Sequence, residues 1–257
     1  MKAATIVSVA PLRKEAAHRS EMVSELLLGE CVEITDSTKD FYQIKSLYDG
    51  YEGWCQKSQL TQVDDHFYNN NHKLLTAEPI TKALCNGKNI FIPSGCFIGC
   101  FHEGVLQINN TTISFPDSPF HFNETDDDVD IYEIVHPYIN TPYLWGGKSI
   151  FGIDCSGFTQ QVFKMLDIKL PRDAYQQAAL GEAVGFLQEA QIGDLAFFDN
   201  EEGRITHVGI LFNESNIIHS SGKVRVDKMD NMGIVNTETG ERTHQLRLIK
   251  RFLGSQQ

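Results

Sequence analysis

Cys155 stands where a glycine-rich turn ends and the clearest helical pattern of the chain begins. The turn carries Gly146 and Gly147, and apolar residues recur after the cysteine at helical spacing: Phe158, Val162, Met165 and Leu166. Beyond residue 194 the chain shows only short strand patterns, at 195–198, 208–212, 216–219 and 246–253. Helical patterns that precede strand patterns, instead of alternating with them, indicate an α+β domain with an antiparallel sheet.

The first half of the chain shows many short strand patterns and no long helical one. In residues 1–63 the strand patterns 41–47 and 51–55 flank an Asp-Gly pair typical of a hairpin turn, which predicts a small β-barrel. Further strand patterns at 90–92, 96–99, 105–108 and 111–115 predict a second, diverged barrel over 64–122. The acidic run 123–128 predicts a solvated linker and the start of a third domain, 123–257.

Two later histidines give Cys155 the partners that a cysteine nucleophile needs. His207 follows it by 52 residues and stands at the head of a strand pattern, and His219 comes 12 residues later, inside the next one. Such groups must meet in space, not in sequence. We therefore predict Cys155 as the nucleophile, His207 as its base and His219 as the group that orients the base. The start of a helix should favour the thiolate. The plain alternative is an inert buried cysteine with two structural histidines.

Composition excludes several classes of partner. The chain carries 34 acidic and 22 basic residues, a net charge of −12, so we expect no nucleic-acid partner and no binding to anionic membranes. A small substrate with a free amino group suits this charge better. Six cysteines show no disulfide spacing, which favours a reducing compartment. Cys96, Cys100 and His102 lack a second pair of ligands, so we expect no metal, and nothing calls for an organic cofactor.

The segments around the predicted triad resemble the NlpC/P60 family of papain-like cysteine peptidases. The matching stretches are YLWGG at 143–147, DCSGF at 154–158, LPRD at 170–173, GDLAFF at 193–198, ITHVGI at 205–210 and IHSSG at 218–222. In the first half, LGE at 28–30 and GYEGW at 50–54 resemble bacterial SH3-like modules. The resemblance implies an α+β fold, in which a papain-like NlpC/P60 catalytic domain is preceded by two small SH3-like β-barrels.

Two such modules before an NlpC/P60 domain resemble the γ-D-glutamyl-L-diamino-acid endopeptidases. These enzymes cut murein peptides that carry a free N-terminal L-alanine, between γ-D-glutamate and the diamino acid. The resemblance implies the same hydrolysis here, by a cysteine peptidase without a cofactor. It also implies six substrate-binding residues: Asp154, Ser156, Asp173, Trp145, Tyr51 and Glu30.

Each of these residues has an expected role. Asp154 and Ser156 flank the nucleophile, and Asp154 can bind the substrate ammonium. Asp173 is a further binding position, and Trp145 forms an aromatic wall. Tyr51, with Glu30 beside it, closes the end of the groove that receives the substrate's N-terminus. Asp154 and Asp173 can instead be helix caps, and Tyr51 can instead belong to the core of the first barrel.

The expected setting follows from the start of the chain and from the charge. Residues 3–9 are expected to form a first strand, not the core of a signal peptide. We therefore expect a cytoplasmic monomer that recycles small murein peptides, with a periplasmic or secreted protein as the alternative. Two rival functions stay open: a papain-like amidase or acyltransferase, and a wall-binding protein whose enzyme domain is residual.

Overall fold

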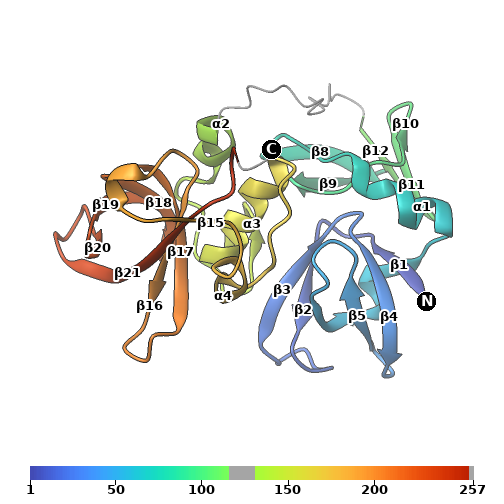
Figure 1. The fold of residues 1–257 in the computed structure, drawn as a ribbon. Coiled ribbons are helices and arrows are strands. Elements are labelled where there is room, and N and C mark those ends of the chain that lie inside the picture. Colours follow the sequence, from blue (N-terminus) through green and yellow to red (C-terminus); the bar gives the residue numbers. More distant parts are fainter. Residues whose placement is uncertain (116–130, 255–257) are drawn as a thin grey trace. The chain divides into compact units, whose positions relative to one another are not determined.

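The chain folds into two compact units. The computed structural model, drawn in Figure 1, describes residues 1–115 and 131–254. Unit 1 consists of residues 1–115 together with 145–151, and unit 2 of residues 131–144 and 152–254. The predicted linker at 123–128, and with it the predicted boundary at 122, lies outside the described residues. Residues 145–151 fall inside the predicted third domain in the sequence, yet they pack as part of unit 1.

Within residues 1–115, the first sheet of unit 1 has the strand order β3-β2-β6-β5-β4-β1-β7. Its strands are β1 (Lys2–Thr5), β2 (Val9–Arg13), β3 (Met22–Leu27), β4 (Cys31–Ser37), β5 (Phe41–Ser46), β6 (Glu52–Gln56) and β7 (Leu60–Gln62), with η1 (Lys57–Gln59) before the last. The predicted hairpin joins β5 and β6. Gly50 in its turn has a φ of 72°, the left-handed region that glycine enters at little cost.

The second sheet of unit 1 has the order β10-β11-β12-β8-β9. It follows α1 (Asp65–Asn70) and η2 (Asn71–Lys73) and contains β8 (Ile80–Cys85), β9 (Lys88–Pro93), β10 (Phe101–His102), β11 (Val105–Ile108) and β12 (Thr111–Ser114). The predicted strand at 96–99 is wrong, because this segment forms only an isolated bridge from Phe97 to Leu75.

The two sheets of unit 1 pack together in one of its apolar clusters. Leu27 and Leu28 of the first sheet pack in the same cluster as Ile92 and Leu106 of the second. A buried amide ties them further: the Asn71 Nδ2 donates to the carbonyl oxygens of Gly29, at 2.9 Å, and Phe97, at 2.8 Å. The two small sheets therefore bury part of their apolar surface jointly, and the first sheet also has a core of its own that includes Leu12, Val32 and Ile44.

The helices of unit 2 are short, and one of them carries the predicted nucleophile. They are α2 (Ile131–Val135), η3 (His136–Tyr138), α3 (Cys155–Met165), α4 (Ala174–Gln177) and η4 (Leu187–Glu189). Helix α3 begins at Cys155, as predicted, and Asp154 caps it by accepting a hydrogen bond from the Gly157 N–H at 2.7 Å. No helix in the described parts of the chain has the length and apolar character needed to cross a membrane.

The described part of unit 2 contains an antiparallel sheet of order β15-β21-β16-β17-β18-β19-β20. The strands are β15 (Glu182–Val184), β16 (Leu195–Asp199), β17 (Ile205–Asn213), β18 (Asn216–Ser221), β19 (Lys223–Asp230), β20 (Gly233–Val235) and β21 (Arg242–Arg251). Two shorter strands, β13 (Lys148–Ser149) of unit 1 and β14 (Gly152–Ile153) of unit 2, precede α3 and are not part of this sheet. Because β20 also pairs with β21, the strands from β16 to β21 close into a barrel. The predicted α+β architecture is confirmed.

Candidate active site

The Cys155 thiol lies at the buried start of α3, with 7% of the residue exposed. Burial raises the pKa of this thiol to about 12, and the Asp154 carboxylate adds to the rise. Hydrogen bonds from the backbone N–H groups of Val208 and Ser156, and the charge of Arg172, oppose that rise without cancelling it. The prediction of a thiolate at the helix start is therefore wrong: loss of hydration outweighs the partial charges of the helix end, and the thiol is protonated at neutral pH.

His207 and His219 lie on neighbouring strands of the barrel and contact each other. Gly209 of β17 is directly opposite His219 of β18, so His207, two residues earlier, shares its face of the sheet. The His207 Nε2 and the His219 Nδ1 are 2.8 Å apart. Gly209 makes room for this contact, because a Cβ there would lie 2.9 Å from the His219 Cβ. The Val208 N–H that reaches the Cys155 thiol belongs to the residue after His207.

A carboxylate lies behind His219. The His219 Nε2 is 3.0 Å from the Asp227 Oδ2, and both side chains are buried. Asp227 also accepts hydrogen bonds from the Arg225 Nη2, at 3.0 Å, and the Thr237 N–H, at 2.9 Å. Burial favours a higher pKa for this carboxyl, but the hydrogen bonds from His219, Thr237 and Arg225 outweigh burial and lower its pKa. Asp227 was not predicted, because the sequence showed no strand pattern at 223–230 and a single acid carries no local signal of burial.

A third histidine stacks on His207. The His244 ring on β21 lies 4.1 Å from the His207 ring, with 24° between the ring planes. Burial, followed by the neighbouring His244 and His219, holds the pKa of His207 well below its usual value. Burial likewise lowers the pKa of His244 to about 4. Both imidazoles are therefore neutral at neutral pH.

The three histidines bring ring nitrogens within 4.8 Å of one another, so a shared metal has to be considered. Two ligands of a tetrahedral zinc with bonds of about 2.0–2.1 Å lie roughly 3.3 Å apart. The 2.8 Å between His207 and His219 is shorter and fits a hydrogen bond. The stacked His244 and His207 rings also lie in nearly parallel planes, and lone pairs in two parallel planes do not converge on one ion. The geometry therefore favours a hydrogen-bonded relay over a metal centre.

Asp154 and Ser156, predicted to hold the substrate, meet a buried cation. The Arg172 Nη1 donates to the Asp154 Oδ1 at 2.9 Å and to the Ser156 Oγ at 2.9 Å, and its Nη2 donates to the Asp154 Oδ2 at 2.6 Å. Asp154 thus has the capping role that the sequence left open, and its contact with a substrate ammonium stays a prediction. Asp173 precedes α4, where the Gln176 Oε1 accepts from its N–H at 3.2 Å. Its contact with substrate also stays a prediction.

Tyr143 is a further polar group near the thiol. Its side chain is half-buried, and burial together with the nearby Cys155 and Asp154 raises the pKa of its phenol. The phenol therefore stays protonated and can donate a hydrogen bond. Tyr143 lies in the stretch 143–147 that resembles the family, and the sequence predicted no role for it.

The other predicted substrate residues belong to unit 1. The Glu30 carboxylate is buried, and both its oxygens lie 3.3 Å from the Lys148 Nζ. Trp145 is 61% exposed, and its Nε1 donates to the Glu21 Oε1 at 3.0 Å. Tyr51 packs against the core of the first sheet, as the alternative interpretation has it. That these side chains also contact a substrate stays a prediction.

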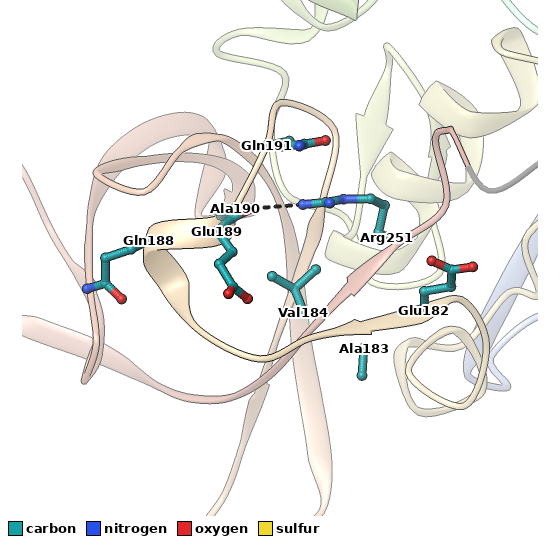
Figure 2. A pocket seen from close by; sticks show the side chains of 8 residues that line it. All are labelled: Glu182, Ala183, Val184, Gln188, Glu189, Ala190, Gln191 and Arg251. Carbon is teal, nitrogen blue, oxygen red and sulfur yellow. Dashed lines mark hydrogen bonds between the residues drawn. The ribbon is translucent and has the colours of Figure 1, made fainter.

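A surface pocket of about 480 Å³ lies elsewhere on unit 2. Its lining comes from β15, η4 and β21 and includes Glu182, Glu189 and Arg251, as Figure 2 shows. The Arg251 Nη2 donates to the Glu189 carbonyl oxygen at 2.8 Å. The candidate catalytic residues, all of them described, are not part of this lining. The pocket is therefore distinct from the site at the start of α3.

Comparison with known proteins finds a family match over the segment that carries this site. The NlpC/P60 family matches residues 140–243, which include Cys155, His207 and His219. The chain contains an NlpC/P60 domain. The bacterial dipeptidyl-peptidase SH3 domain matches residues 12–60, within the first sheet of unit 1. The peptidase family and the SH3-like module predicted from the sequence are thereby confirmed.

Two relatives extend over most of the chain. The chain is 26% identical over 259 residues to a gamma-D-glutamyl-L-lysine dipeptidyl-peptidase of Bacillus cereus, which covers 88% of this chain and 76% of the relative. It is 25% identical over 257 residues to dipeptidyl-peptidase 6 of Lysinibacillus sphaericus, covering 90% and 92%. A crystal structure of an NlpC/P60 family protein from Bacillus cereus shares the fold, with a TM-score of 0.81 at 22% identity over 98% of this chain and all of that one.

Proposed function

We propose that this protein is a cysteine peptidase that hydrolyses the bond between γ-D-glutamate and the diamino acid in murein peptides with a free N-terminal L-alanine. One observation carries the proposal: the hydrogen-bonded pair of His207 and His219, at 2.8 Å, adjoins the backbone N–H that reaches the Cys155 thiol. The names of the two long relatives, a gamma-D-glutamyl-L-lysine dipeptidyl-peptidase and a dipeptidyl-peptidase 6, support the choice of bond.

The chemistry starts from a neutral thiol and a neutral imidazole. As the Cys155 sulfur bonds to the γ-glutamyl carbonyl carbon, its proton passes to His207. The resulting oxyanion can accept hydrogen bonds from N–H groups at the start of α3 and from the Tyr143 phenol. His207 then gives the proton to the departing amine as the C–N bond breaks. Water, deprotonated by His207, hydrolyses the thioester and restores the thiol.

Recognition of the substrate is proposed to rest on its free ammonium. Asp154 and Ser156 flank the nucleophile in the sequence, Asp173 adds a further acid, and the net charge of −12 favours a cationic ligand. Small peptides with a free amino end arise when murein is broken down. Recycling of such peptides is therefore the setting that we propose.

The test compares defined peptides with purified protein and with a Cys155→Ala variant. We expect L-Ala-γ-D-Glu-L-Lys, or its diaminopimelate counterpart, to yield the dipeptide L-Ala-D-Glu and the free diamino acid, identified by mass. The variant should release neither product while its circular dichroism stays unchanged. Cleavage of the L-Ala–D-Glu bond, or turnover by Cys155→Ala, would contradict the proposal.

Further substrates separate the rival functions. Simple amides and ester donors test an amidase or acyltransferase, and binding of Cys155→Ala to isolated sacculi tests a wall-binding protein. Poly-γ-glutamate tests a different γ-glutamyl substrate. It is included because a gamma-DL-glutamyl hydrolase of Bacillus subtilis is 39% identical to this chain over 102 residues, although these cover only 38% of this chain and 24% of that one.

A further inference from the structure

We propose that Asp227 is a positioning residue that sets the tautomers of both histidines and so leaves the Nδ1 of His207 as the base. The inference deepens the proposed function and rests on it for the role of His207. It extends the predicted triad of Cys155, His207 and His219 by a fourth, buried member.

The strand register explains how Asp227 reaches His219. In the pairing of β18 with β19, Arg225 lies opposite His219 and Asp227 lies opposite Ile217. Residues two apart share a face of a sheet, so Asp227 is the diagonal neighbour of His219 on its own face. The His219 ring lies between two partners, with its Nδ1 2.8 Å from His207 and its Nε2 3.0 Å from Asp227. Three consecutive strands thus contribute one member each.

The Asp227 carboxylate determines which ring nitrogens of His219 and His207 carry hydrogen. An ionised carboxylate only accepts hydrogen bonds, so the His219 Nε2 facing Asp227 carries a hydrogen. In the form of His219 that carries one hydrogen, the Nδ1 is then left as an acceptor. The His207 Nε2 must then donate to it, and the remaining nitrogen of neutral His207, Nδ1, holds a lone pair. That nitrogen is the one left to take a proton from a thiol.

The surroundings of Asp227 keep it ionised and fixed. Arg225 pairs with it, with the Arg225 Nε 2.8 Å from the Asp227 Oδ2, and the Thr237 N–H and hydroxyl both donate to its Oδ1. The cluster also contains Glu238, whose Oε2 lies 3.3 Å from the Arg225 Nη1 and whose Oε1 lies 4.0 Å from the Lys223 Nζ, and His244, 5.7 Å from His219 between ring centroids. A carboxylate with this many donors holds one orientation, and it therefore holds His219 as well.

An Asp227→Asn variant removes the charge and keeps the shape. The new amide can donate to the His219 Nε2, which would move the His219 hydrogen to Nδ1. His219 would then donate to the His207 Nε2, and neutral His207 would carry its hydrogen on Nδ1, where it cannot accept a proton. We expect kcat to fall roughly 10–100-fold, the usual effect of losing a group that orients a functional histidine through a hydrogen bond to its ring.

The decisive measurement is nitrogen-15 NMR of histidine side chains at neutral pH. His207→Gln and His219→Gln variants assign the two rings. In the unaltered protein we expect both rings to carry hydrogen on Nε2 and a lone pair on Nδ1. In Asp227→Asn at least one ring should change tautomer. An Nδ1–H form of either ring in the unaltered protein would overturn the proposal without any variant having to fold.

A matched control uses another acid of the same strand. Asp230 pairs with Arg242 through two hydrogen bonds of 2.7 Å at the surface, and the N–H groups of Met232 and Gly233 also donate to its carboxylate. Asp230→Asn should leave the tautomers and the pH profile of kcat unchanged. Equal tautomers in Asp227→Asn and Asp230→Asn would refute the positioning role. The tautomer readout needs no substrate, so a protein that cleaves no γ-glutamyl peptide contradicts the proposed function and leaves the inference about Asp227 standing on its own test.

Discussion

Replacing Arg172 by methionine tests how much of unit 2 depends on one buried ion pair. Arg172 is 2% exposed and donates two hydrogen bonds to Asp154, which is 6% exposed. Arg172→Met keeps the apolar part of the side chain and leaves the Asp154 carboxylate without its cation. Breaking a buried pair on one side costs about 3–5 kcal/mol, because a buried charge stays uncompensated.

The loss of stability should appear in α3, because Asp154 is the N-cap of this helix. Native-state hydrogen exchange of the α3 amides, measured over a urea series, gives the free energy of opening. We expect this free energy to fall by about 3–5 kcal/mol, a large part of the 5–15 kcal/mol typical of a folded domain. Tryptophan fluorescence serves as an internal control. The chain has two tryptophans, Trp54 and Trp145, and both belong to unit 1. The tryptophan fluorescence should therefore not change in the Arg172→Met variant.

Two further variants make the reasoning refutable. Arg242→Met breaks the exposed pair with Asp230 and should hardly alter the exchange of α3, since surface pairs contribute little. Removing both charges, in Arg172→Met with Asp154→Asn, should cost less than the two single changes added together. If Arg172→Met lowers the opening free energy by less than about 1 kcal/mol, Asp154 is not held by this pair.

Three more outcomes follow from the site. With the pKa of Cys155 near 12, its alkylation by iodoacetamide should be slow at neutral pH and rise about tenfold per pH unit up to pH 10 or so; a plateau near neutrality would show a thiolate instead. His207→Ala should lower kcat/KM about as much as Cys155→Ala, and His219→Ala less, because an orienting group is partly replaceable; the reverse order would exchange their roles. His207 and His244 have lowered pKa values in the folded state, so the unfolded chain binds more protons below about pH 6.5. Unfolding experiments should therefore show the free energy of unfolding falling as pH drops from about 6.5 toward 4. Each of the two histidines contributes up to roughly 1.4 kcal/mol per pH unit, and the partly exposed His244 contributes less. A His244→Phe variant should make the decrease shallower.

The parts of the site that depend on local patterns could be predicted from the sequence. Glycines before Cys155 and apolar spacing after it predicted the start of α3, and strand patterns placed His207 and His219 on the sheet. Asp227 and Arg172 escaped prediction, because their contacts depend on strand register and on tertiary packing that no short window contains. The pKa of Cys155 was misjudged for a related reason: the helix start is visible in the sequence, but the depth of burial is not.

The position of residues 145–151 bears on how the protein is made. Lys148 supplies the ammonium beside the buried Glu30 carboxylate, and its backbone N–H donates to the Glu25 Oε2 at 2.8 Å. A ribosome finishes residues 1–115 long before it adds Lys148, so a nascent chain that ends earlier holds the Glu30 carboxylate without that cation. Unit 1 can therefore reach its final stability only when translation has passed the glycine turn and arrived at the nucleophile. The same few residues that complete unit 1 lead straight into Cys155, which links the maturation of the N-terminal half to the appearance of the catalytic helix.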